Sequence, residues 1–287
     1  MTVFLNARAL AGGGGVAAAI TACTATVGSS APLSINDLQS FIHGKDVLIG
    51  THGFNVNQHD GIECLSEWEP LLQLPGSAVF VGLLWPGDSD SVYALSYPVE
   101  PANAMQAGTM VGQFIDANFA DAASVSLVSH SLGTRVVLQA ISTMNRRVRR
   151  AILMAGAVSD DCLTAEFADV PGKVDSITIL SSLQDEILQW AFPLGNLAGE
   201  IIGRDHPWWQ SALGRFGPTV APPNFAPPNR IPDEWSYGHL DYLRVDPPAH
   251  TPIPPPTPVP AGGATPLHGS PGWQQAWSAS FVSSRFR

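Results

Sequence analysis

The chain has 287 residues, of which 45% are hydrophobic and 13% are charged, and its formal net charge is −10. Disordered chains have few apolar residues and many charges, so this composition predicts a folded chain with a sizeable core. Binding to a phosphate backbone needs clustered Lys and Arg side chains. The negative net charge therefore argues against a nucleic-acid partner.

The cysteines and the N-terminal segment bear on the compartment. Cys23, Cys64 and Cys162 stand far apart and form no paired motif, which favours a reducing compartment. Residues 12–31 resemble the apolar part of a signal peptide, but they are rich in Gly and Thr, and only Arg8 supplies a basic side chain before them. We expect a cytoplasmic protein, with secretion as the alternative. No apolar run reaches about 18 residues, so we expect no membrane-spanning helix.

The predicted strands are apolar runs. Residues 2–10 are short and β-prone, and the small-residue segment after them is either a loop or a second strand. Five uninterrupted apolar runs follow, at residues 46–53, 78–86, 124–131, 150–158 and 174–183. Runs of this kind are typical of parallel strands that are buried on both faces of a sheet.

Helix-length segments alternate with these runs, at residues 63–74, 100–119, 132–144, 161–167 and 184–197. The alternation predicts an α/β fold, with a predominantly parallel open sheet and helices on both faces. We expect one domain over residues 1–245 and a Pro-rich C-terminal extension over residues 246–287. In such folds the functional residues lie at the carboxyl ends of the strands.

The sequence Ser-His-Ser-Leu-Gly, residues 129–133, joins a predicted strand to an amphipathic helix. The nucleophile elbow of serine hydrolases is written G-x-S-x-G and holds its serine in a strained strand-to-helix turn. Ser129 stands in place of the first glycine, but its side chain is also small. We interpret Ser131 as a nucleophile, with an ordinary strand-to-helix turn as the alternative.

A nucleophilic serine needs hydrogen-bond donors for the oxyanion that its attack creates. The predicted strand at residues 46–53 runs into the sequence His-Gly-Phe-Asn. We expect the backbone N–H groups of Phe54 and Leu132 to form this oxyanion hole. His52 and Asn55 would brace the loop rather than react.

In folds with this elbow, the serine, the acid that orients the base and the histidine base follow one another in that order along the chain. Asp185 comes directly after the predicted strand at residues 174–183, and it could instead cap the helix that begins there. Asp160 and Asp161, which follow the preceding strand, are the alternatives.

The base follows the acid. His239 lies among aromatic residues in the sequence SYGHLDYL, and it is the favoured candidate, with His206 next. His250 and His268 fall in sequence that is rich in Pro and Gly.

Together these motifs resemble the α/β-hydrolase superfamily, and in particular its bacterial members with a His-Gly-(Phe/Tyr)-Asn oxyanion loop. The matching segments, within roughly residues 46–243, are HGFN (52–55), LLWPG (83–87), SHSLG (129–133), SSLQDEIL (181–188) and YGHLDYL (237–243). The resemblance implies a triad of Ser131, Asp185 and His239, and an oxyanion hole from Phe54 and Leu132. It requires no metal ion or organic cofactor, and the histidines show no metal-ligand spacing.

We therefore interpret the chain as a serine hydrolase of the esterase or lipase type, acting on a small-molecule or lipid-like ester. Trp208 and Trp209 are expected in a cap or pocket segment over residues 188–232, where they would select an apolar acyl or alcohol group. Two alternatives stay open at this point. The same triad could transfer an acyl group or cleave an amide, or the chain could be a non-catalytic binding module.

Overall fold

The computed structural model describes residues 1–9, 15–88, 100–189, 211–226, 230–243 and 273–287. Within these residues the chain forms an eight-stranded sheet of order β3-β2-β1-β5-β4-β6-β7-β8. The strands are β1 (Thr2–Arg8), β2 (Val16–Thr26), β3 (Ser29–Leu33), β4 (Asp46–Thr51), β5 (Ala78–Leu84), β6 (Ser124–His130), β7 (Val148–Met154) and β8 (Val174–Leu180). The pairs β1–β2 and β2–β3 are antiparallel, and the other neighbouring pairs are parallel. The predicted open, predominantly parallel sheet is confirmed.

The five predicted apolar runs form β4 to β8, and the central strands are buried along almost their whole length. The register between β4 and β6 determines which residues of the two following segments lie side by side. Thr51, the last residue of β4, pairs with Ser129 of β6. The loop that follows β4 therefore lies beside the Ser-His-Ser-Leu-Gly turn that follows β6.

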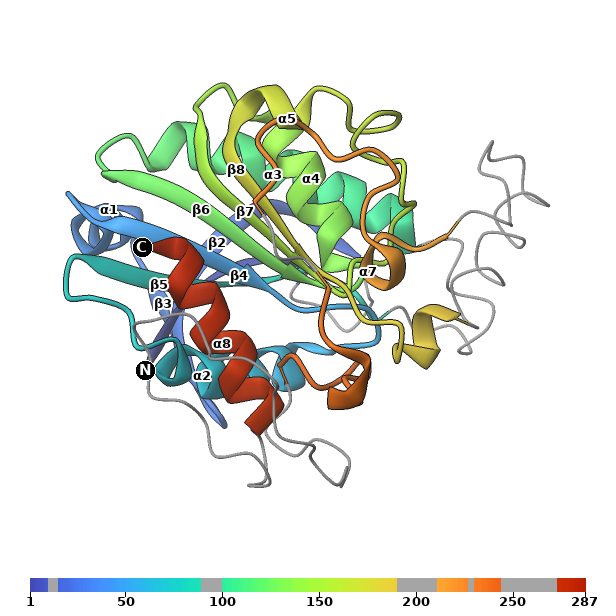
Figure 1. Ribbon diagram of the computed structural model, residues 1–287. Helices are drawn as coiled ribbons and strands as arrows, with labels where there is room; N and C mark the ends of the chain where they lie inside the picture. Colours follow the sequence, from blue (N-terminus) through green and yellow to red (C-terminus); the bar gives the residue numbers. More distant parts are fainter. Residues whose placement is uncertain (10–14, 89–99, 190–210, 227–229, 244–272) are drawn as a thin grey trace.

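Helices cover both faces of the sheet (Figure 1). Those described are α1 (Ile35–Ile42), α2 (Gln58–Leu72), α3 (Glu100–Asn118), α4 (Gly133–Thr143), α5 (Val170–Lys173), α7 (Leu213–Phe216) and α8 (Trp273–Phe286), with the 3₁₀ helix η1 (Asp233–Trp235). The chain passes through α2 toward one edge of the sheet and through α3 and α4 toward the other. Right-handed crossovers then put α2 on the face opposite α3 and α4, and α8 packs against α2.

One segment differs from its prediction. Residues 161–167, predicted as a helix, form a series of turns instead. The Thr164 hydroxyl donates to the Asp161 carbonyl at 2.9 Å, and the Ser159 hydroxyl donates to the Asp161 carboxylate at 2.6 Å. Short polar side chains that bond the local backbone compete with regular helix in this way. Of the two alternatives for the small-residue segment after β1, a loop or a strand, the strand is found: the segment pairs with β1 as the antiparallel strand β2.

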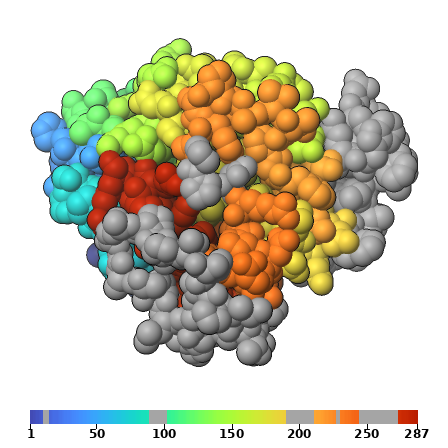
Figure 2. Space-filling view, viewed as in Figure 1, coloured from blue at the N-terminus to red at the C-terminus, as the bar shows by residue number. Residues whose placement is uncertain are grey.

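The sequence left open whether the last 40 or so residues fold back on the sheet. Helix α8 does so, and its residues Trp273, Trp277 and Phe281 belong to the same hydrophobic core as the strands. Trp277 makes edge contacts with Trp235 and Tyr237, at ring-centroid distances of 5.0 and 5.8 Å. In Figure 2 α8 (red) reaches the surface beside the segments after residue 210 (orange). The aromatic contacts thus join α8 to the segment just before His239.

None of the helices in the described part of the chain has both the length and the apolar character needed to cross a bilayer.

Replacing Trp277 by Ala tests how much of the stability comes from α8. The indole is buried among aromatic rings, so we expect the free energy of unfolding to fall by about 3–5 kcal/mol. Phe41→Ala is the matched control, because that ring is 37% exposed and its loss should cost about 0.5 kcal/mol or less. Urea unfolding measures both variants, and equal losses would contradict a core role for α8.

Candidate active site

Ser131 occupies a tight turn between β6 and α4. Its φ angle is +54°, a left-handed conformation that costs a non-glycine residue about 1–3 kcal/mol. Neighbouring backbone holds the turn: the Ser131 N–H donates to the Met154 carbonyl at 3.0 Å, and the Ala157 N–H donates to the Ser131 carbonyl at 3.1 Å. The strained turn directs the Ser131 side chain out of the strand, as in a nucleophile elbow.

Small residues surround the turn because backbone segments approach closely there. A Cβ atom on Gly133 would lie 2.3 Å from the His52 carbonyl oxygen, and one on Gly53 would lie 2.7 Å from the Ser131 Cβ. At the position two residues before Ser131, the Ser129 side chain is fully buried, and its Oγ lies 3.1 Å from the Thr134 Oγ1. Serine is therefore accommodated where the usual elbow motif has glycine.

Two hydrogen bonds connect Ser131 to Asp185 through His239. The Nε2 atom of His239 lies 2.8 Å from the Ser131 Oγ, and its Nδ1 atom lies 2.7 Å from the Asp185 Oδ2. Since carboxylate oxygens accept, Nδ1 carries the proton and Nε2 is left to accept from the serine hydroxyl. The exposed fractions are 5%, 8% and 0% for Ser131, His239 and Asp185. The sequence-predicted serine, histidine and acid therefore come together in a buried site.

Asp185 also caps a helix, which is the alternative role that its place in the sequence allows. Its Oδ1 accepts from the Leu188 N–H at 2.8 Å, at the start of the helical residues 186–189. One carboxylate oxygen fixes the side chain and the other bonds to His239, so the two roles coexist. Both ring nitrogens of His239 are occupied, which leaves no place for Asp160 or Asp161. The other candidate bases, His206, His250 and His268, lie outside the described residues.

The segment that carries His239 has little regular structure, and side chains from other elements bind its carbonyl groups. The Ser182 hydroxyl donates to the Tyr237 carbonyl at 2.6 Å, and the Ser278 hydroxyl donates to the Tyr242 carbonyl at 2.8 Å. The Gln275 amide donates to the Leu243 carbonyl. These donors come from the end of β8 and from α8. They fix an irregular backbone whose buried polar groups would otherwise be costly.

The side chain of His130 binds the backbone carbonyl of His239 itself. Its Nε2 lies 2.7 Å from the His239 carbonyl oxygen. Sequence reasoning missed His130 because it occupies a variable position of the elbow motif. It also missed Ser182, Gln275 and Ser278, whose only signal was their polar character beside apolar neighbours.

The loop after β4 is braced by Trp85. The indole Nε1–H donates to the His52 carbonyl at 2.9 Å, and the Trp85 N–H donates to the His52 Nε2 at 3.4 Å. The His52 ring lies nearly parallel to the indole, at 5.9 Å between centroids. Asn55, with φ at +57°, donates its N–H to the Gly87 carbonyl at 2.7 Å. His52 and Asn55 thus brace the loop that contains Phe54.

Phe54 and Leu132 belong to the two segments that meet at the Ser131 side chain. Phe54 follows Gly53, which packs directly against the Ser131 side chain, and Leu132 follows Ser131 itself. Both residues therefore lie at the carboxyl edge that β4 and β6 share. Trp208 and Trp209 lie outside the described residues, as does most of the predicted cap segment.

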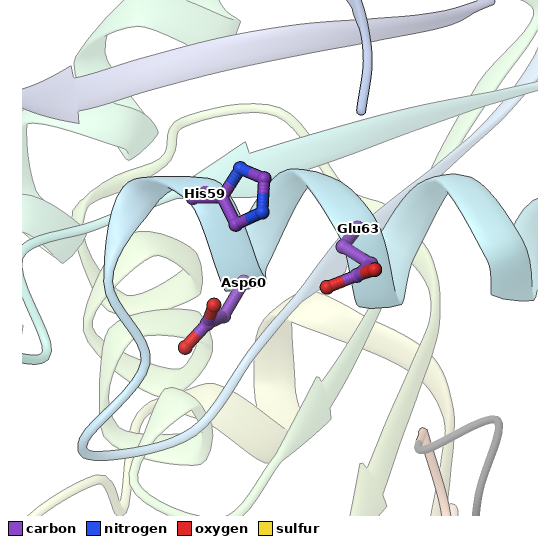
Figure 3. A group of neighbouring side chains, drawn as sticks. All are labelled: His59, Asp60 and Glu63. Carbon is purple, nitrogen blue, oxygen red and sulfur yellow. The ribbon is translucent and has the colours of Figure 1, made fainter. Parts of the chain in front are cut away.

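One group of potential metal ligands occurs among the residues that the structure describes. His59, Asp60 and Glu63 have ligand atoms within 4.8 Å of one another on the first turns of α2 (Figure 3). Asp60 already accepts from the Asn57 side-chain amide at 2.9 Å. Gly61, on the same helix, faces His52. His59 and Glu63 lie two residues to either side of Gly61, so they point away from His52.

The buried histidines make stability depend on pH. Burial lowers the pKa of His52 to about 4, and burial together with the nearby His239 lowers that of His130 to about 3. The unfolded chain takes up these protons near pH 6.5, before the folded chain does. Protonation then favours unfolding, and we expect the free energy of unfolding to fall between pH 6 and pH 5. Each of the two groups contributes about 1.4 kcal/mol per pH unit.

Denaturant titrations at pH 6, 5.5 and 5 measure this slope. His130→Gln, which removes one of the two groups, is expected to lower it by about 1.4 kcal/mol per pH unit. A variant with the slope of the wild type would contradict the burial of a neutral imidazole at residue 130.

Comparison with known families agrees with the fold. A family model described as "Alpha/beta hydrolase of unknown function (DUF900)" matches residues 33–210. The match spans more than half of the chain, from just before α1 through the elbow and Asp185. The expected membership of the α/β-hydrolase superfamily is confirmed. The chain belongs to this alpha/beta hydrolase family of unknown function, DUF900.

Proposed function

We propose that the protein is a serine hydrolase that cleaves carboxylic esters through an acyl-enzyme intermediate. The observation that carries this proposal is the hydrogen-bonded chain from Asp185 through His239 to Ser131, with distances of 2.7 and 2.8 Å. These distances lie within the range expected for an acid, a base and a nucleophile that act together. The family match supports hydrolase chemistry without naming a substrate.

In the first half of the reaction, Ser131 Oγ attacks the ester carbonyl carbon while His239 Nε2 takes the hydroxyl proton. The imidazolium that forms is stabilised by the Asp185 carboxylate, which holds the Nδ1 proton. The carbonyl oxygen becomes an oxyanion and accepts hydrogen bonds from the N–H groups of Phe54 and Leu132. Collapse of this intermediate breaks the ester bond, and His239 returns its proton to the leaving alcohol.

In the second half, water replaces the alcohol. His239 Nε2 takes a proton from the water as its oxygen attacks the acyl carbon. The bond to Ser131 Oγ breaks, the proton passes from His239 to that oxygen, and the carboxylic acid leaves. The serine and the histidine are thereby restored to their starting protonation states.

Two described cysteine thiols are poor competitors for the role of nucleophile. Burial raises the pKa of Cys64 to about 12, and burial also raises the pKa of Cys162. A thiol is nucleophilic as the thiolate, so these two groups remain unreactive at neutral pH. This supports serine rather than cysteine chemistry.

The substrate pocket is proposed on the sequence, since its residues lie outside the described part of the chain. Trp208 and Trp209 follow a proline and stand among polar residues, between the acid and the histidine. Two adjacent indoles at this point would form an apolar wall for the acyl or alcohol group.

Hydrolysis of p-nitrophenyl esters from acetate to palmitate tests the proposed function. We expect activity in the wild type and a loss of at least about 10³-fold in kcat for Ser131→Ala. Ser142→Ala is the matched control, because that hydroxyl lies at the far end of α4 and bonds to Asp169. It should keep the wild-type rate. A folded wild type that hydrolyses none of the esters, or a Ser131→Ala variant that retains the activity, would contradict the proposal.

The double substitution Trp208→Ala and Trp209→Ala tests the pocket. We expect KM to rise about tenfold for long-chain esters and to change little for the acetate, because only the long chains would use the apolar wall. Unchanged kinetics across the ester series would contradict the assignment of the two tryptophans to the pocket.

A further inference from the structure

His130 directly precedes the proposed nucleophile, yet its side chain turns to a segment more than 100 residues away. Its Nε2 lies 2.7 Å from the carbonyl oxygen of His239. A carbonyl only accepts, so the Nε2 of His130 carries the proton and donates it. The side chain is 7% exposed, and the hydrogen bond is therefore shielded from water.

The same ring touches the oxyanion loop and the aromatic residues beyond His239. Its centroid lies 4.9 Å from that of His239 and 5.7 Å from that of Tyr242. At its Nδ1 atom the ring approaches the loop after β4, where a Cβ atom on Gly53 would lie 3.1 Å from the His130 Nδ1. His130 thus fills the space between the segment of the base and the loop that would bind the oxyanion.

The His130 ring is uncharged at neutral pH, which suits a position beside His239. Burial and the neighbouring His239 keep its pKa near 3, so the ring is neutral. Two further titratable groups near it are also uncharged at pH 7: His52, whose pKa burial lowers to about 4, and Tyr242, whose pKa burial raises well above 10. His130 therefore offers a hydrogen bond without placing a positive charge beside the imidazolium that His239 would become.

An apolar side chain could fill the same volume but could not bind the carbonyl. An unsatisfied buried carbonyl disfavours its own position, and small displacements of a reacting group carry large kinetic costs. A misplacement of about 1 Å can lower a rate by about 10²-fold. Side chains from other elements also bind the carbonyls of Tyr237, Tyr242 and Leu243. The His130 bond is the one made to the residue of the base.

We propose that His130 is a positioning residue for His239: its Nε2–H holds the His239 carbonyl, and its ring separates that segment from Gly53 at a fixed distance. This inference rests on the proposed function, since it assigns a role within that site. It predicts that kcat depends on a hydrogen-bond donor at the position of Nε2, and not only on a side chain of the same volume.

Three substitutions in the full chain separate the donor from the volume. Glutamine can place an N–H close to the position of Nε2, asparagine is too short to do so, and leucine has no donor. We expect His130→Asn and His130→Leu to lower kcat by about 10²-fold, with KM within about threefold of the wild type. His130→Gln should retain kcat within about fivefold. Ester kinetics and the rate of fluorophosphonate labelling are measured on each, after denaturant unfolding shows that it is folded.

The outcomes are distinct. A folded His130→Leu variant with wild-type kcat would overturn the proposal, as would equal losses in the Gln and Asn variants. If the Leu variant does not fold, the comparison of Gln with Asn still decides between donor and volume. A wild-type protein that neither hydrolyses esters nor labels at Ser131 would remove the proposed function and this inference with it. Failure of the His130 test alone would leave the Ser131→Ala result intact.

Discussion

The hydrogen bond between His239 and Ser131 is the interaction on which the site depends. It joins residues 108 positions apart in the chain, and it continues through His239 to Asp185 at the end of a third segment. A hydrogen bond weakens steeply when its length or angle departs from the favourable range. The three segments must therefore be positioned independently to within a few tenths of an ångström.

Each segment is fixed by different means. Ser131 is held in a left-handed turn by backbone bonds to β7 and to the residues after it. Asp185 is held by its own cap on the following helical turn. His239 has no such regular element, and its segment is held by side chains from the ends of β6 and β8 and from α8. The last helix of the chain thus stabilises the site without supplying a reacting group.

Much of the fold could be predicted because buried parallel strands appear in the sequence as uninterrupted apolar runs. The runs that became β4 to β8 are apolar on both faces, and the elbow stands out because Ser131 lies where such a run gives way to an amphipathic pattern. Asp185 and His239 followed from chain order and from their neighbours.

Other features could not be predicted because they depend on tertiary contacts. The hydrogen bond from His130 to the His239 carbonyl exists only once β6 and the later segment meet. Helix α8 combines buried Trp, Gln and Ser side chains. The sequence after the proline-rich segment therefore lacks the simple apolar stripe from which a core helix is predicted. The turns at residues 161–167 depend on local side-chain bonds that compete with the helix.

The most direct test of the central claim is to locate the adduct that a fluorophosphonate forms on the folded protein, by peptide mass spectrometry. The hydrogen-bonded chain predicts a single adduct on Ser131, formed at least about 10²-fold more slowly in His239→Ala, because the base that activates the hydroxyl is gone. An adduct on another residue, or labelling of Ser131 that does not depend on His239, would contradict the account.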